Sequence, residues 1–178
     1  MKDVLVNGKD YNVTFDVKGE EFRSHQDILR ARSEVFHRML SHDMLEKNKG
    51  IIEVLDCDPH AFGLFLHYVY TGEVKTLDEH TALDLYYIAD KYNMPHLKEK
   101  CSEFIKKSLS VTNVCYAIHL ALEHNDTSLL DTVTRFFNNN VDPITSTVEW
   151  QTFIKEHPTQ VSELIVKSVT KSKETTFP

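Results

Sequence analysis

The spacing of apolar residues changes along the chain, and this change constrains the fold more than any other feature. Residues Val13–Val17 alternate apolar and polar side chains, which is typical of a half-buried strand. Lys18 and Gly19 can form a tight turn, and Glu20–Ser24 returns as a second strand, so the segment predicts a hairpin. From residue 58 onward the apolar residues recur every three or four positions, as in amphipathic helices. The sequence therefore predicts a mixed head followed by an all-helical region.

The part of the chain between the hairpin and residue 58 predicts two short helices and one more strand. Apolar side chains in 25–42 are spaced for two helices with a break near Arg32 and Ser33. Residues 51–55 have the aliphatic composition of a strand, and the polar run 47–50 before them is typical of a loop. The head is thus expected to contain a small three-stranded sheet flanked by helices.

Helix boundaries in the remaining chain are marked by residues that satisfy free backbone groups at helix ends. Pro59 suits the first helical position, and Gly72 is expected just past the end of that helix. A break at 93–95 and another at 138–143 separate later helices. A short helix is expected around Trp150, and a last helix is expected to carry Val161, Leu164, Ile165 and Val169. Candidate N-caps precede three of the predicted helices: Asp58, Ser110 and Asp126. Another amphipathic helix is expected from Asp78.

Composition limits the classes of partner and compartment. The chain has 20 Lys and Arg against 27 Asp and Glu, a net charge of −7, which disfavours binding to nucleic acid or to an anionic membrane surface. The sequence has no stretch near the roughly 20 apolar residues that span a bilayer, and no apolar N-terminal core of a signal peptide. The three cysteines Cys57, Cys101 and Cys115 form no CxxC pair and fit a reducing compartment. We therefore expect an intracellular protein of the cytoplasm, the nucleus or both.

A search for chemical motifs gives no enzyme signature. The ten histidines include no HExxH pair, and no Cys–His set has the spacing of zinc ligands. Motifs of the GxSxG, GxxxxGK[ST] and GxGxxG types are absent, and the five glycines are dispersed. We expect no catalytic residue, no metal and no cofactor, with the histidines and thiols serving structural roles.

Three ordered blocks carry a family resemblance. The first runs from Gly19 to Leu40, the second is FLHYVYTG at 65–72, and the third is ADKY at 89–92. In the first block the aromatic strand residue Phe22 is followed by five residues at positions characteristic of the block: His25, Leu29, Ala31, Ser33 and Phe36. Over residues 11–108 this arrangement resembles the BTB/POZ domain. The resemblance implies an α+β BTB/POZ fold at 1–108.

The resemblance is closest to the speckle-type POZ proteins, which are substrate adaptors for cullin-3 ubiquitin ligases. It continues through Ser110–Asn113, Glu149–Trp150 and His157–Pro158. This implies an all-α extension at 109–172, called a 3-box or short BACK region, before a flexible tail at 173–178. Nothing in the sequence resembles the MATH domain that precedes BTB in such adaptors, so we expect either a fragment of one or a scaffold that selects no substrate.

Cullin-binding members of the family carry a hydrophobic-x-Glu motif in a loop. In the segment 41–47 of this sequence, Met44 aligns with the hydrophobic position and Glu46 with the acid, with Leu45 between them. A flexible Met side chain can fill a groove of a partner, and the carboxylate can fix its register. The alternative is that Met44 folds back onto its own core. The resemblance also assigns Tyr92, Asn93 and Met94, at a turn between two helices, to the surface that binds the cullin-3 N-terminal domain.

Two surfaces for self-association follow from the same resemblance. Val4 and Leu5 would pack across a two-fold axis near Leu29 in a homodimer. Leu164 and Ile165 align with a second region of self-association, which would build higher oligomers, although Ile165 could instead pack within its own helical hairpin.

One departure from the family concerns a charged pocket of repressor members. This chain has Asn12 and Gln26 where the family has Asp and Lys, and we expect the two to hydrogen-bond as a neutral pair. The predicted function is therefore an adaptor that self-associates and docks cullin-3 to bring substrates for ubiquitination. The alternative is a BTB homodimerisation scaffold, structural or transcription-regulatory, without cullin binding.

Overall fold

The computed structural model describes residues 11–40 and 51–174, and the side chains of these residues up to position 170. The chain divides into two compact units, residues 1–101 and 102–178. The division falls within one helix, α6 (Pro95–Lys107), so the first turns of α6 belong to the first unit and the remainder to the second.

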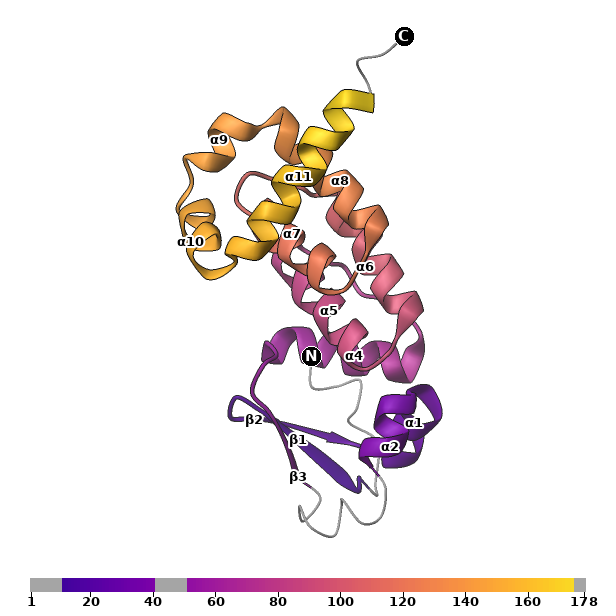
Figure 1. Ribbon diagram of the computed structural model, residues 1–178. Coiled ribbons are helices and arrows are strands. Elements are labelled where there is room, and N and C mark those ends of the chain that lie inside the picture. Colours follow the sequence, from indigo (N-terminus) through magenta and orange to yellow (C-terminus); the bar gives the residue numbers. More distant parts are fainter. Residues whose placement is uncertain (1–10, 41–50, 175–178) are drawn as a thin grey trace. The chain divides into compact units, whose positions relative to one another are not determined.

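The first unit contains a three-stranded sheet in the order β2-β1-β3 (Figure 1). Strand β1 (Val13–Val17) pairs antiparallel with β2 (Glu20–Ser24) and parallel with β3 (Ile51–Val54). Lys18 and Gly19 both have positive φ angles, 51° and 89°, as a two-residue hairpin turn of matching twist requires. The expected hairpin and third strand are confirmed.

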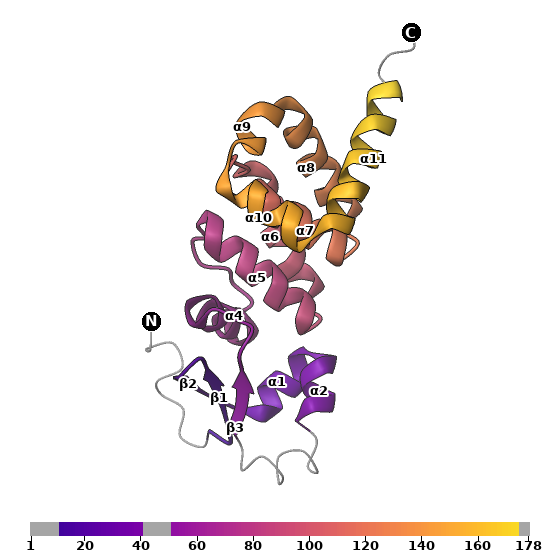
Figure 2. The same ribbon diagram turned by 60° about the vertical axis from the view of Figure 1, so that its left-hand side comes forward.

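In the described part of the first unit, four complete helices and the start of a fifth accompany the sheet. They are α1 (Gln26–Arg32), α2 (Glu34–Met39), α4 (Pro59–Thr71), α5 (Glu79–Lys91) and the start of α6. Ser33 is extended and separates α1 from α2, which lie beside the sheet in Figures 1 and 2. Asp58 caps α4 as predicted, and Asp78 caps α5. Each accepts a hydrogen bond from the backbone N–H three residues on.

Up to residue 174, where the described structure ends, the second unit continues from α6 with helices. These helices are α7 (Val114–Glu123), α8 (Thr127–Asn139), α9 (Val141–Thr145), α10 (Val148–Glu156) and α11 (Pro158–Glu174). Helix α7 packs on α8, and α11 contacts both of them. Together with the sheet-containing first unit, these helices confirm the predicted α+β head and helical extension. The domain boundaries at 108 and 172 stay a prediction.

Three boundaries in the second unit differ from expectation. Helix α7 begins at Val114, because Ser110 caps a preceding turn in which its hydroxyl accepts a hydrogen bond from Asn113 N at 3.3 Å. Pro143 was expected to lie in a break, but it lies in the first turn of α9. A helix tolerates proline there, because the backbone N–H that proline lacks has no hydrogen-bond partner within the first turn. Helix α11 continues to Glu174, so the first residues of the expected tail are helical.

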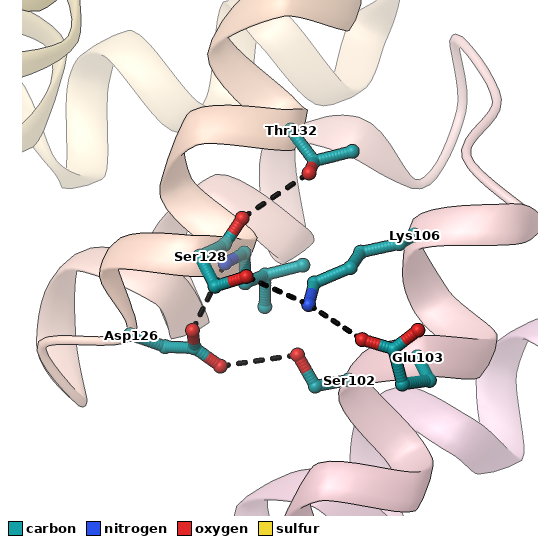
Figure 3. Close-up of polar contacts among 7 residues, drawn as sticks. Ser102, Glu103, Lys106, Asp126, Ser128 and Thr132 are labelled. Atoms are coloured by element: carbon teal, nitrogen blue, oxygen red, sulfur yellow. Dashed lines mark hydrogen bonds and ion pairs between the residues drawn. The ribbon is translucent and has the colours of Figure 1, made fainter.

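Within the second unit, side-chain hydrogen bonds join the end of α6 to α8 (Figure 3). Ser102 Oγ donates to Asp126 Oδ2 at 3.1 Å, while Asp126 Oδ1 accepts from the backbone N–H of Leu129 at 2.9 Å. The Lys106 ammonium donates to Ser128 Oγ at 2.9 Å and to Glu103 at 2.8 Å. Asp126 therefore acts both as the N-cap of α8 and as an anchor for α6.

Candidate protein-interaction site

The turn between α5 and α6 is held by backbone hydrogen bonds. Asn93 has a φ of +51°, and its N–H donates to the Asp90 carbonyl at 2.9 Å. The Met94 N–H donates to the Ala89 carbonyl at 2.7 Å. This pair of bonds is the Schellman ending of a helix, in which asparagine is one of the residues that tolerate the left-handed conformation. The turn is therefore a defined structure that holds the exposed Asn93 side chain outward from the helix end.

Aromatic packing fixes Tyr92, the residue before this turn. The Tyr92 ring stacks on Phe36 at 4.4 Å and on Phe65 at 5.1 Å between centroids. Burial raises the pKa of the Tyr92 phenol above its usual value of 10, so the phenol stays neutral. The Lys91 ammonium lies 5.5 Å from the centre of the same ring, within cation–π range. The turn thus rests on an aromatic stack contributed by α2 and α4.

Ser33 ties the start of α2 to the same turn. Its hydroxyl donates to the Tyr92 carbonyl at 2.6 Å and accepts from Phe36 N at 3.2 Å, and the Ser33 side chain is buried. The first bond satisfies a carbonyl at the end of α5, and the second caps α2. Helix α2 ends at Met39, and its C-cap Leu40 is the last residue before the segment 41–50. The helix that leads into that segment is therefore anchored on the α5–α6 turn.

An ion pair beside the turn involves Asp56, which follows β3. The Lys91 ammonium donates to both carboxylate oxygens of Asp56, at 2.6 and 2.7 Å, and the Tyr87 hydroxyl donates at 2.7 Å. Burial acts to raise the pKa of Asp56, but the hydrogen bonds from Lys91 and Tyr87 outweigh it and lower that pKa to about 2. The pair joins the end of the sheet to the end of α5.

The residues predicted to bind cullin-3 fall into two groups. Met44, Leu45 and Glu46 lie outside the described residues. Tyr92 and Met94 are only 1% and 7% exposed, whereas Asn93 is exposed. Of the described three, Asn93 alone presents its side chain to solvent, and the other two position it. Their assignment to a cullin-binding surface stays a prediction.

The residues predicted for self-association also differ in accessibility. Val4 and Leu5 lie outside the described residues, while Leu29 and Leu164 are fully buried in their own units. The side chains of these two leucines pack in the core of the single chain, and their assignment to self-association stays a prediction. The α11 stripe, defined as the three exposed aliphatic residues of that helix, remains accessible: Ile165, Val166 and Val169.

Asn12 and Gln26 form a hydrogen bond, as expected, but it joins the Asn12 side chain to the Gln26 backbone and not to the Gln26 side chain. Asn12 Oδ1 accepts a hydrogen bond from the backbone N–H of Gln26 at 2.8 Å. The Gln26 Oε1 atom is buried and has no hydrogen-bond partner among the described residues. The neutral replacement therefore caps the start of α1 instead of reproducing the paired charges of the family pocket.

The sequence did not predict two of the contacts at this turn. Ser33 was predicted to lie at a break between two helices. Its position three residues before Phe36 was the available signal that it caps the second helix. No local pattern indicated its hydrogen bond to the Tyr92 carbonyl. The Asp56–Lys91 pair joins residues 35 positions apart, and no local pattern connects them.

Comparisons with known proteins agree with this architecture. The family model for the BTB/POZ domain matches residues 1–109. Two mouse relatives, "TD and POZ domain-containing protein 4" and "TD and POZ domain-containing protein 1", are each 34% identical to this chain over 148 residues, which cover 83% of it. The matched region spans 40% of the length of each relative. The closer resemblance to speckle-type proteins stays a prediction. The three-stranded sheet, the order of its helices and the family match together assign this chain to the BTB/POZ domain family.

Proposed function

We propose that this chain is a protein-interaction adaptor that docks the N-terminal domain of cullin-3 and associates with itself, as part of a ubiquitin ligase that brings substrates for ubiquitination. BTB/POZ domains are protein-interaction modules, and this class of function follows from the family. Cullin-3 as the partner is the finer step, and it rests on the segment 44–46 together with the α5–α6 turn. The proposed adaptor acts inside the cell, in the cytoplasm, the nucleus or both, without a metal or cofactor.

The observation that carries this proposal is the anchoring of α2 on the turn. A docking segment loses less conformational entropy on binding when the element that precedes it is already fixed. The 2.6 Å bond from Ser33 to the Tyr92 carbonyl and the Phe36–Tyr92 stack supply such a fixed base. In the proposed complex Met44 is an adaptable apolar anchor, Glu46 supplies a charge, and Asn93 adds a polar contact to the partner.

A titration of the purified chain with the cullin-3 N-terminal domain tests this function. Replacing Met44→Asp together with Glu46→Lys removes the anchor and reverses the acid, and we expect affinity to fall by about thirtyfold or more, as for a hot spot. The control is Glu156→Gln on α10, an exposed site with the same net change in charge. An absence of binding by the unmodified chain, or equal binding by the double variant, would refute cullin docking.

Self-association is tested separately through the α11 stripe. A contiguous exposed aliphatic face on a helix is typical of an interaction surface. Light scattering should show a smaller mass for the pair Ile165→Asp and Val169→Asp than for the unmodified chain. Val148→Asp, at another exposed aliphatic position, is the matched control. A mass that is identical for all three proteins excludes the stripe as an association surface.

The stripe also favours the second candidate, a homodimerisation scaffold without cullin binding. The two functions share the fold and differ in one measurement. A chain that self-associates through α11 and shows no affinity for the cullin-3 domain would be such a scaffold.

A further inference from the structure

The sheet of the first unit presents a row of carboxylates on its outer face. In the pairing of the strands, Asp16 lies opposite Glu21 on β2 and opposite Glu53 on β3. All three side chains project to the face opposite the buried Phe15 and Val17, because successive residues of a strand alternate sides. Like charges directly opposite one another destabilise a sheet. This row of like charges therefore lowers the folding stability of the isolated chain, and the packing of the sheet does not require it.

Partial compensation is present for two of these acids. Asp16 Oδ1 accepts a hydrogen bond from Gly19 N at 2.8 Å, and Glu21 lies 3.6 Å from the guanidinium of Arg23. Both contacts are exposed and weak. Within residues 11–40 and 51–170, the structure gives Glu53 no ion pair. Glu53 lies on β3, one of the two edge strands of the sheet, and among the described residues its carboxylate is open to an external cation.

Exposed aliphatic side chains lie on either side of Glu53 along β3. Ile51 is 50% exposed and Leu55, one position past the strand, is 72% exposed. The three residues occupy positions i, i+2 and i+4 and so share the outer face, about 7 Å apart in an extended chain. Strand β3 stands at one side of the sheet order, next to β1 (Figure 2). The outer face of β3 thus reads aliphatic, acid, aliphatic.

We propose that this β3 face, defined by Ile51, Glu53 and Leu55 with the neighbouring Asp16 and Glu21, docks an extended segment of a partner protein. The segment carries a Lys or Arg between two aliphatic residues, in the pattern apolar-x-basic-x-apolar. Its cation pairs with the carboxylate row and relieves the cross-strand repulsion, while its aliphatic residues cover Ile51 and Leu55. This surface shares no residue with the α5–α6 turn or with the α11 stripe, so it serves a partner additional to those of the proposed function.

The test uses a fluorescein-labelled peptide, acetyl-Gly-Ser-Val-Thr-Lys-Thr-Leu-Ser-Gly, titrated with the full chain and followed by fluorescence anisotropy. A second peptide with Glu in place of Lys is the ligand control. The protein variants are Glu53→Lys and, as a matched control, Glu99→Lys, an exposed acid of α6 in the same unit with the same change in charge. Circular dichroism verifies that both variants are folded.

We expect the Lys peptide to bind and the Glu peptide not to bind. Glu53→Lys should weaken binding by about tenfold, through one lost attraction and one new repulsion, whereas Glu99→Lys should change it by less than about twofold. Ile51→Ser should also weaken binding, which general attraction to an acidic protein would not produce. The proposal is overturned if the Lys peptide shows no saturable binding up to about 1 mM. It is equally overturned if the two charge variants weaken binding to the same extent.

Discussion

The substitution Ser33→Ala tests whether the α5–α6 turn is held by α2. The variant removes the N-cap of α2, which typically costs about 1 kcal/mol. It also leaves the Tyr92 carbonyl without the hydroxyl donor that lies at 2.6 Å, and a buried unsatisfied acceptor costs about 1–3 kcal/mol. The two losses share one side chain, so we expect the free energy of unfolding to fall by about 2–3 kcal/mol.

The assay combines urea unfolding, followed by far-UV circular dichroism, with hydrogen exchange measured by mass spectrometry. Exchange should accelerate in peptides covering 34–40 and 92–94, because both ends of the lost hydrogen bonds lie there. The control is Ser162→Ala, whose hydroxyl donates to the Pro158 carbonyl at an exposed position and whose loss should cost less than about 0.5 kcal/mol. A loss as small as that of the control, with unchanged exchange at 92–94, would refute the tether.

The remaining predictions address an ion pair, a core and a cap. The lowered pKa of Asp56 implies a contribution to folding stability that is present above pH about 4 and is lost as the pH falls towards 2. After solvent screening this contribution is about 1 kcal/mol, and the Asp56→Asn variant should lack it. Urea unfolding of both proteins between pH 5 and pH 2 measures the difference. Leu164→Ala should lower stability by about 2–5 kcal/mol and Ile165→Ala by less than about 0.5 kcal/mol, as thermal or urea unfolding would show; equal effects would contradict their different burial. Asp126→Ala should cost about 2 kcal/mol through the lost α8 cap and the unpaired Ser102 hydroxyl, and Trp150 fluorescence, which reports on the second unit, should show the earlier transition.

Elements whose signals are local were predictable. The hairpin followed from alternation over 13–17 and a two-residue turn, and the helices followed from apolar spacing and from caps such as Asp58 and Asp126. The start of the helix after Ser110 was predicted one turn too early. The Ser110 hydroxyl caps a separate turn before that helix, and the sequence of such a turn resembles a helix start. These features depend on residues three or four positions apart, which the sequence displays directly.

The candidate site was less predictable because its parts are brought together by packing. The motif at 44–46 and the turn at 92–94 were recognised through family resemblance, but the burial of Tyr92 and Met94 was not. Leu164 and Ile165 are adjacent aliphatic residues, and no local pattern decided that the first enters the core while the second faces solvent. Which face of a helix is covered depends on where its neighbours pack.

The order of strands and helices, their capping residues and the BTB/POZ character were contained in the sequence, because periodicity and caps act over a few residues. The tertiary structure alone decided that Ser33 meets the Tyr92 carbonyl 59 positions away, that Lys91 meets Asp56, and that three acids line up across the sheet. Such contacts arise when separate apolar faces are buried against each other, and the polar partners they bring together are a consequence of that packing.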